Sequence, residues 1–551
     1  RRERRAVGRE PARRHPVDSP GATPPWTDDP AFESLESAYR ALLEAWGEWM
    51  VVHHRGAPLY PGGPHEAAVA AALVDARRSL GVALEGIDRA TVATADGAAL
   101  DNIRSSLPEL DAWASPLDGI APHGAPEAAS EEPDVAALRR ATFDAWGAAM
   151  AGLPVAGELL DRLTVSARLA REPDAERRRA LFLALRPGWE ALHGDGGPSS
   201  PYRRLVRSSA ARWAREGSPI DANAAALGMD PATVEQTMRR LLAAYRAVAL
   251  GDELVEPWDY RFVTGGLARR LDDALPVDRL RLVNDAHLRS IGADPDALRI
   301  RYNIVPRPGR PVIPTAFTVT EDVGRLERGT WVPATPWIFA TYAEGGLGNL
   351  EELLHESGHA LHYAALRSRP AHFAWPADQA AFVEAVADVV GWTTHEPAFL
   401  RDQLGAAVSV RESVVARFGA VALDAAWTLF EIELHRRPSR SPNEAWAEIS
   451  ERDLGVVGHP EWAWWAHRGQ LIDGPGYLSS YALGAVMVAA VRARIRAMRG
   501  DWSTGDLGWY AFVSERLLRF AGARTPASIL GEFLEGPLTA GPLLAAIEAG
   551  A

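Results

Sequence analysis

Apolar residues recur three and four positions apart along most of the chain from Phe32 onward. This spacing puts them on one side of a helix that turns about every 3.6 residues, so it predicts helices packed by one face. Residues 32–50, 174–194 and 233–250 show the pattern clearly, and it returns from about residue 380 to the end. We therefore expect a mostly α-helical protein.

Patterns typical of β-strands occur in one part of the chain, residues 299–342. Residues 299–305, 313–320 and 331–342 are rich in β-branched and aromatic residues and are punctuated by Pro and Gly, which predicts strands of a small sheet. An edge strand of such a sheet can hold an extended peptide by backbone pairing, whatever the peptide's side chains.

Two stretches lack apolar periodicity. Residues 1–28 are rich in Pro, Arg and small polar residues and predict a disordered basic segment, and the Pro/Gly/Ser-rich interval 115–134 predicts a long loop. Residues 1–16 carry seven arginines and two glutamates, a net charge of +5. Since the whole chain has a net charge of −13, the rest of the chain has a net charge of −18. An acidic body of this kind is an unlikely binder of nucleic acid.

Composition excludes several kinds of chemistry. The chain has no cysteine, and its 59 basic residues are all arginine. Thiol nucleophiles, thiolate metal sites, disulfides, lysine Schiff bases and P-loop lysines are therefore absent, and there is no G-x-S-x-G motif. Any metal must be held by His, Asp or Glu. No apolar run is long enough for a membrane span and no signal sequence is evident, so we expect a cytoplasmic protein without a membrane partner.

The sequence HESGH at residues 355–359 carries the strongest chemical signal. On a helix, His355 and His359 project from the same face, where both rings can bind one metal ion, and Glu356 reaches the same side. Two histidine ligands and a glutamate general base are typical of zinc hydrolases.

The boundaries of this helix are predicted from its flanks. Asn349 can cap its N-terminus, with Gly348 just ahead, and Glu352, three residues later, can complete a capping box. The helix should end before Pro370.

The next helical pattern supplies further ligands. Glu384 and Asp388 lie four residues apart on an otherwise apolar helix, where burying two carboxylates is costly unless a cation compensates them. We expect Glu384 to be the third zinc ligand, the alternative being a partner for a buried arginine. Asp388 is expected to accept the free N–H of His355 or His359, or to be a structural carboxylate. His362 is a second candidate for the outer shell, or a histidine of the helix surface.

HESGHALHY followed by FVEA, with Glu384 lying 25 residues after His359, resembles the thimet oligopeptidase and oligoendopeptidase F group of zinc peptidases. Gly358 and His362 also agree with the H-E-x-G-H-x-x-H pattern of that group. The resemblance implies two helical lobes flanking a deep substrate channel, with one Zn²⁺ ion on the channel floor. An aspartate at position 388 is instead typical of the related angiotensin-converting-enzyme-like dipeptidyl carboxypeptidases.

The resemblance also implies roles for residues near the C-terminus. Tyr477 and Tyr481, at helical spacing, correspond to the tyrosines with which these peptidases stabilise the tetrahedral intermediate; from spacing alone they would be core residues. His467 precedes Tyr477 by ten residues, a longer gap than in the family, and is expected either to assist the same step or to lie on a surface loop. The GPG sequence at 474–476 indicates a mobile loop.

These observations together predict a peptidase of three parts: a disordered segment 1–28, a helical lobe or lid at 29–250 and a catalytic region at 251–551. We expect zinc-dependent cleavage of short peptides, with Glu356 as the general base. Dipeptidyl carboxypeptidase activity and a non-catalytic helical binding protein that retains the zinc site are the alternatives. The sequence leaves the oligomeric state open.

Overall fold

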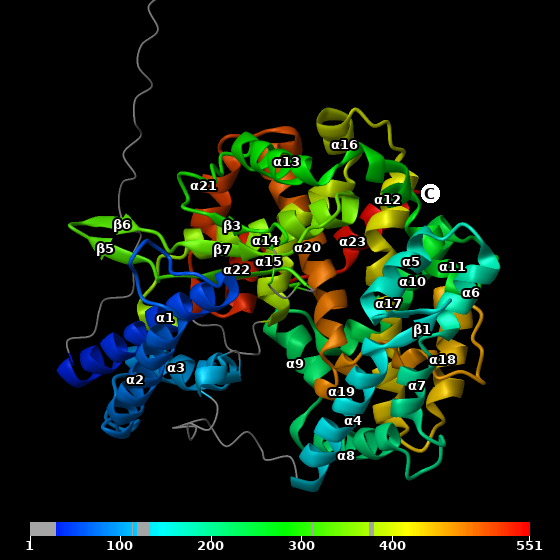
Figure 1. The fold of residues 1–551 in the computed structure, drawn as a ribbon, viewed down its shortest axis with the longest axis horizontal. Helices are drawn as coiled ribbons and strands as arrows, with labels where there is room; N and C mark the ends of the chain where they lie inside the picture. The colour runs from blue at the N-terminus through cyan, green and yellow to red at the C-terminus, as the bar shows by residue number, and fades with distance from the viewer. Residues whose placement is uncertain are drawn as a thin grey trace, which may run out of the picture.

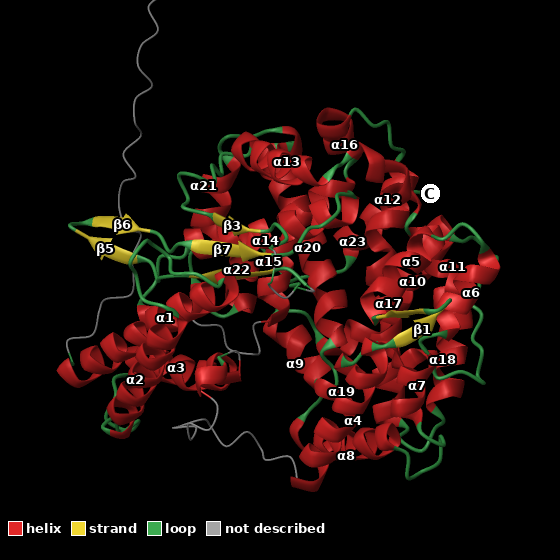
Figure 2. Cartoon of the chain, viewed as in Figure 1, coloured by secondary structure: helices red, strands yellow, loops and turns green. Residues whose placement is uncertain are grey.

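The structure is a computed structural model that describes residues 29–112, 114–117, 133–307, 309, 312–313, 315–373 and 380–551. It is mostly helical with a few small sheets, which confirms the expected fold class (Figures 1 and 2). The segment 1–28 and most of the predicted loop at 115–134 lie outside the described residues.

The helices fall into three stretches of the chain. The first comprises α1 (Pro30–Arg55), α2 (Glu66–Glu85) and α3 (Thr94–Ala112). The second comprises α4 (Pro133–Ala151), α5 (Arg162–Arg171), α6 (Ala175–Leu183), α7 (Arg186–His193), α8 (Pro201–Glu216), α9 (Pro219–Ala226), α10 (Val234–Ala249), α11 (Pro257–Thr264), α12 (Gly266–Leu271) and α13 (Val277–Ser290). The third comprises α14 (Leu347–Ala365), α15 (Ala380–Gly391), α16 (Pro397–Leu404), α17 (Val410–Arg436), α18 (Pro442–Ile449), α19 (Gln470–Asp473), α20 (Leu478–Arg499), α21 (Trp509–Val513), α22 (Pro526–Leu534) and α23 (Gly541–Glu548).

The three clearest helical patterns are confirmed as α1, α6 with α7, and α10. The pattern at 174–194 is divided between two helices because Pro187 is not tolerated in the interior of a helix. It occupies the second position of α7, where its missing N–H costs no helical hydrogen bond. Helix α1 begins where Asp29 accepts a hydrogen bond from the backbone N–H of Ala31, 2.9 Å away.

The predicted strand segments form a three-stranded sheet in the order β3 (Arg301–Asn303), β7 (Pro336–Phe339), β4 (Phe317–Thr320). Strand β7 pairs parallel with β3 and antiparallel with β4, so β4 is an edge strand. Two further pairs are hairpins, β5 (Arg325–Glu327) with β6 (Thr330–Val332) and β1 (Leu153–Val155) with β2 (Glu158–Leu160). The sheet contacts α1 on one side and α14 on the other, which sets β4 beside HESGH.

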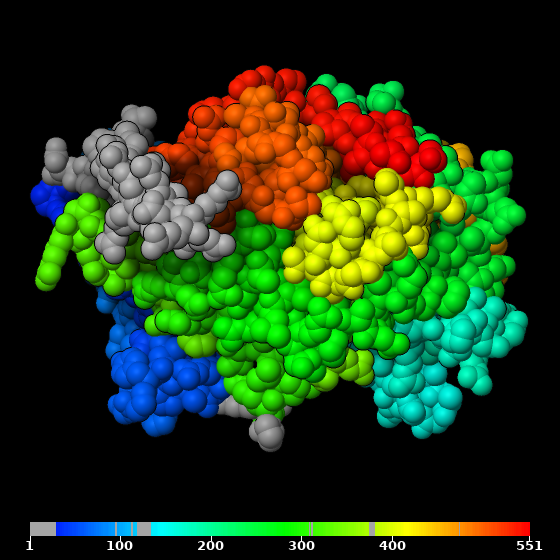
Figure 3. Space-filling model, turned by 90° about the horizontal axis from the view of Figure 1, so that it is seen from above, coloured from blue at the N-terminus to red at the C-terminus, as the bar shows by residue number. Residues whose placement is uncertain are grey.

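Two hydrophobic clusters make up the core. The smaller joins α1, α2 and α3 to part of the sheet and to the segment that follows α14, whereas the larger contains residues from α4 to α23. Helices α4 to α10 thus share a core with the region after residue 250, and the predicted lobe 29–250 spans both clusters. Figure 3 shows α1–α3, in blue, and the residues near 150–200, in cyan, at opposite ends of the molecule.

Two helices, α17 and α20, are long and apolar enough to cross a membrane by length and composition. In the structure 72% and 83% of their most apolar stretches are buried, and the two helices pack against each other. Their apolar character is accounted for by their place in the larger core.

Candidate metal centre and its cavity

The helix that carries HESGH begins earlier than its capping signals predict. Helix α14 starts at Leu347, so the prediction that Asn349 caps it is wrong. Gly346 at the N-cap has φ of 105°, and the backbone N–H of Leu347 points to the carboxylate of Asp272 at 3.4 Å. The side chain of Asn349 instead donates to the carbonyls of residues 344 and 345. A tertiary contact rather than a local capping box therefore sets this end.

Glu352 is the second half of the predicted capping box, and it too has another role. Its carboxylate accepts a hydrogen bond from the backbone N–H of Ala316, 3.3 Å away, and so ties α14 to the residue just before β4. The end of the helix agrees with prediction, since α14 stops at Ala365, before Pro370.

Helices α14 and α15 approach closely at the glycine of HESGH. A Cβ atom on Gly358 would lie 2.4 Å from the carbonyl oxygen of Ala387 and 2.6 Å from its Cα. Only glycine permits this separation, because the α15 backbone occupies the space of any side chain. The close approach brings Glu384 and Asp388 of α15 against the histidines of α14.

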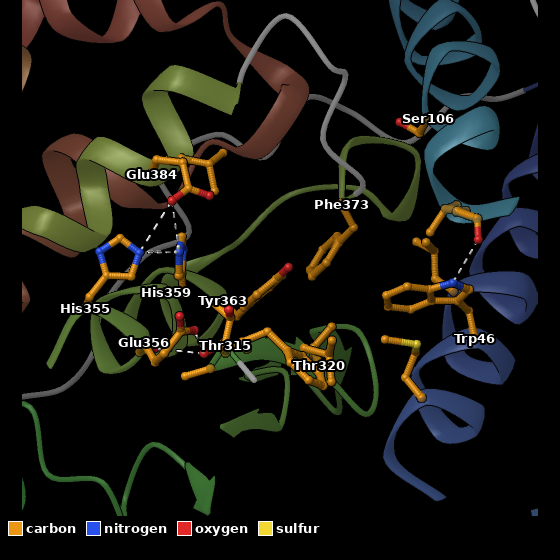
Figure 4. A pocket seen from close by; sticks show the side chains of 18 of the residues that line it. Trp46, Ser106, Thr315, Thr320, His355, Glu356, His359, Tyr363, Phe373 and Glu384 are labelled. Carbon is orange, nitrogen blue, oxygen red and sulfur yellow. Dashed lines mark hydrogen bonds and ion pairs between the residues drawn. The ribbon is translucent and has the colours of Figure 1, made fainter. Parts of the chain in front are cut away.

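Three side chains converge on one point. The Nε2 atoms of His355 and His359 are 3.2 Å apart, and Oε2 of Glu384 lies 3.4 Å from the first and 4.0 Å from the second (Figure 4). Ligands about 2.0 to 2.2 Å from a zinc ion at tetrahedral angles lie about 3.3 to 3.6 Å from one another. The spacing and the N₂O donor set therefore fit a single metal ion.

The surroundings of His355 favour positive charge at this point. Asp388 accepts a hydrogen bond from Nδ1 of His355 at 2.7 Å, which directs Nε2 toward Glu384 and His359. Burial opposes charge on His355, but Asp388, Glu384 and Glu356 outweigh it and raise the pKa of His355 well above its usual value. The pKa of His359 is lowered to about 4 by burial and by His355, so its neutral ring has a free lone pair for a metal.

Glu356 lies beside the histidines and is held by the sheet. One of its carboxylate oxygens and a ring nitrogen of each of His355 and His359 all lie within 4.8 Å of one another. Oγ1 of Thr318, on β4, donates to the Glu356 carboxylate at 2.7 Å. The pKa of Glu356 is raised to about 7, chiefly by burial and further by Glu384 and Glu352, against the lowering effects of His355 and Thr318. A carboxylate with a pKa near neutrality is suited to accept and return a proton.

The two tyrosines differ in their relation to the cavity. Tyr481 lines the same cavity as Glu356 and Glu384, and burial, followed by the charge of Glu384, raises its pKa. Tyr477 packs edge-on against Tyr481 with ring centroids 5.5 Å apart, but it does not line the cavity. A protonated phenol at position 481 can donate a hydrogen bond beside the metal centre.

The two other candidate histidines are buried away from the cavity. His362 is 2% exposed and packs edge-on against Phe382, so it is not a histidine of the helix surface. His467 is 7% exposed and therefore not on a surface loop; its Nε2 lies 3.4 Å from Oγ of Ser166, beside a separate small cavity.

The candidate metal centre opens into a cavity of about 560 Å³. One side is β4 with the residues before it, and the end away from the metal centre is formed by α1, α3 and Phe373 (Figure 4). The contributions of Thr318 and of α1, including Trp46, were missed from the sequence. Only the β-branched pattern of residues 313–320 pointed to this wall.

No protein-family profile and no curated protein sequence matches the chain. Solved structures do match it. An M32 carboxypeptidase from Deinococcus radiodurans R1 has a TM-score of 0.56 at 15% identity, over 94% of this chain and 98% of that one. PZ peptidase A with an inhibitor has a TM-score of 0.54 at 13% identity, over 93% and 96%. A structure described as an oligoendopeptidase F has a TM-score of 0.53 at 15% identity, over 93% and 95%.

These structural matches extend along nearly the whole chain. They include oligoendopeptidase F, which the HESGH motif and its spacing to Glu384 resemble. At such low identity they establish the fold alone. The resemblance is thus confirmed at the level of architecture: this chain has the fold shared by M32 carboxypeptidases and oligoendopeptidase F.

Proposed function

We propose that the protein is a zinc-dependent peptidase that hydrolyses short peptides. The observation that carries the proposal is the convergence of His355, His359 and Glu384, with the Glu356 carboxylate in the same cavity. A structural zinc site usually has four protein ligands. It has no need of an additional carboxylate that does not bind the metal, such as that of Glu356. The fold shared with known peptidases supports the same reading.

In this proposal His355, His359 and Glu384 hold one Zn²⁺ ion. The ion when bound acts as a Lewis acid and lowers the pKa of water. Asp388 keeps the proton of His355 on Nδ1, and so presents the Nε2 lone pair to the metal. The carboxylates of Asp388, Glu384 and Glu356 near His355 favour a divalent cation electrostatically.

Glu356 is the proton carrier of the proposed reaction. Its carboxylate accepts a proton from the attacking water and returns it to the amine that leaves. Thr318 holds the carboxylate in position through its hydrogen bond. Tyr481 donates its O–H to the oxygen of the scissile carbonyl as negative charge develops there, and Tyr477 supports the Tyr481 ring.

The edge strand β4 supplies a binding surface for the peptide backbone. Its free edge lines the cavity, and Thr318 places that edge next to Glu356. An extended peptide that pairs with β4 would bring one carbonyl to the metal centre. A cavity of about 560 Å³ has room for a short unfolded peptide rather than a folded protein.

One observation favours cleavage near the C-terminus of the peptide as a second possibility. Arg162 and Arg261 form no hydrogen bond or ion pair with any residue that the structure describes. Arg468 pairs with Asp424 at 3.2 Å, and its guanidinium lies 5.5 Å from the Tyr481 ring centroid.

These three arginines carry more positive charge than Asp424 neutralises. Burial, then Arg468 and Arg162, lower the pKa of Arg261 to about 10. A peptide carboxylate bound beyond Tyr481 would relieve this repulsion. In a carboxypeptidase, this arginine cluster would bind the free C-terminal carboxylate of the peptide.

The test compares wild type, Glu356→Gln and the control Glu344→Gln on quenched-fluorescence peptides of graded length, with free and blocked C-termini. Glu344 is exposed and lies outside the cavity. We expect all three proteins to bind one zinc ion and kcat to fall by about 10²- to 10⁴-fold in Glu356→Gln alone.

Cleavage of free C-termini only would favour the carboxypeptidase. If wild type binds zinc but cleaves no peptide, the protein is a non-catalytic binding protein and the proposal fails.

A further inference from the structure

The end of the cavity away from the metal centre is apolar. Its lining includes Leu43, Trp46 and Met50 of α1, Leu110 of α3, and Phe373. Figure 4 shows Trp46 and Phe373 at this end. Helical spacing explains why the α1 residues share this face, since positions 43, 46 and 50 are three and four apart. They belong to the smaller hydrophobic cluster or pack against it.

The polar groups at this end are already satisfied. Nε1 of Trp46 donates to the carbonyl of Leu110 at 3.1 Å, and Oγ of Ser106 donates to the carbonyl of Asn102 at 2.8 Å. None of the described residues that line this end is charged, whereas Glu352, Glu356 and Glu384 line the metal end. A charged or polar side chain placed there would lose its hydration and gain no partner.

Strand β4 connects the two ends. The residues that line the cavity include all of β4, which passes from the Glu356 carboxylate toward Val323 and α1. A peptide paired with this edge advances about 3.3 Å per residue, with alternate side chains on one face. A side chain a few residues from the scissile bond therefore reaches the α1 end while the backbone stays on the strand.

We propose that the apolar end formed by α1, α3 and Phe373 is a specificity pocket for one large apolar side chain, such as Phe or Leu, of the peptide substrate. This inference rests on the proposed peptidase function. Burial of such a side chain is worth enough to raise kcat/KM by about 10- to 100-fold over Ala. It also gives the N-terminal helices a role in substrate choice, because Leu43, Trp46 and Met50 of α1 line the pocket.

The proposal is tested with a peptide set in which Phe, Leu, Ala, Glu or Arg is placed at each position in turn. Wild type is compared with Trp46→Arg, with the milder Phe373→Leu and with the control Tyr60→Arg. Trp46 is only partly buried, and Tyr60 is exposed and outside the cavity. Circular dichroism and zinc content verify that each variant is folded.

We expect wild type and Tyr60→Arg to prefer Phe or Leu by at least about 10-fold in kcat/KM at one position. Trp46→Arg should lose that preference and gain activity on Glu at the same position, and Phe373→Leu should reduce the advantage of Phe over Leu.

Equal cleavage of all peptides by wild type would overturn the pocket and leave the peptidase function intact. A preference that Trp46→Arg and Phe373→Leu both leave unchanged would overturn it as well. If no peptide is cleaved, the proposed function fails. Calorimetry then measures the binding of the Phe and Glu peptides to the zinc-loaded protein, and equal affinities would reject the apolar pocket.

Discussion

At the scale of single residues, Glu431 links the core to the segment that carries the tyrosines. Its side chain has no exposed surface, and one oxygen accepts the backbone N–H of Gly476 at 2.6 Å. The other oxygen has no hydrogen-bond partner among the described residues. Burial raises the pKa of Glu431 from 4.5 to about 8. Burial therefore favours the protonated carboxyl in the folded protein, although the hydrogen bond from Gly476 acts in the opposite direction.

Replacement of Glu431 by Gln should change how stability depends on pH. Because the folded pKa of Glu431 is raised, its contribution is present below about pH 4.5 and is lost as pH rises through about 8. The free energy of unfolding of wild type should thus fall more steeply between pH 5 and 8 than that of Glu431→Gln, by at most about 4 kcal/mol. Urea unfolding at several pH values measures the difference. Identical slopes would show that Glu431 does not titrate in this range, and exposed Glu344→Gln is the control.

At the scale of elements, the crossing of α14 and α15 decides the geometry of the metal centre. Each helix alone presents its ligands on one face, as the sequence indicates, but their separation depends on Gly358 and Ala387. Side-chain ridges normally hold helices 8 to 10 Å apart, and a glycine lets them come closer. Three ligands can then surround an ion about 2 Å from each.

A methyl group at Gly358 should therefore weaken metal binding without touching a ligand. In Gly358→Ala the new Cβ meets the α15 backbone, so α15 must move and carry Glu384 away from His355. We expect zinc affinity to fall by at least about 10-fold, by analogy with the loss of supporting interactions at metal sites. Competition with a chelating dye measures the affinity. Gly348→Ala, in the same helix and in open space, is the control and should bind zinc like wild type.

At the scale of the whole molecule, a buried ion cluster joins the first three helices to the rest. Arg369, in the segment after α14, pairs with Glu36 of α1 at 3.0 Å and with Asp96 of α3 at 2.8 Å. All three residues are buried. The cluster holds α1, and with it Trp46, in fixed relation to α14.

Removal of the arginine should destabilise this junction strongly. Arg369→Met leaves two buried carboxylates without their cation, which costs about 3 to 5 kcal/mol. The exposed pair between Arg89 and Asp101 offers a control, because Arg89→Met should leave the free energy of unfolding nearly unchanged. Chemical unfolding monitored by tryptophan fluorescence distinguishes the two. Equal small losses would mean that the N-terminal helices are held by apolar contacts alone.

Local patterns in the sequence were sufficient to predict the local features of the protein. Helical periodicity fixed most helices, and the four-residue spacing of His355 and His359 fixed their common face, because backbone geometry repeats over a few residues. The cost of burying acidic residues on an apolar helix likewise singled out Glu384 and Asp388.

Features that depend on residues distant in the chain became visible in the folded arrangement. The start of α14 is set by Asp272 rather than by Asn349, and Thr318 reaches Glu356 because β4 is an edge strand beside α14. Trp46 enters the same cavity from about three hundred residues away in the chain. Local periodicity specifies which face of an element is buried, but the partner of that face follows from packing of the whole core.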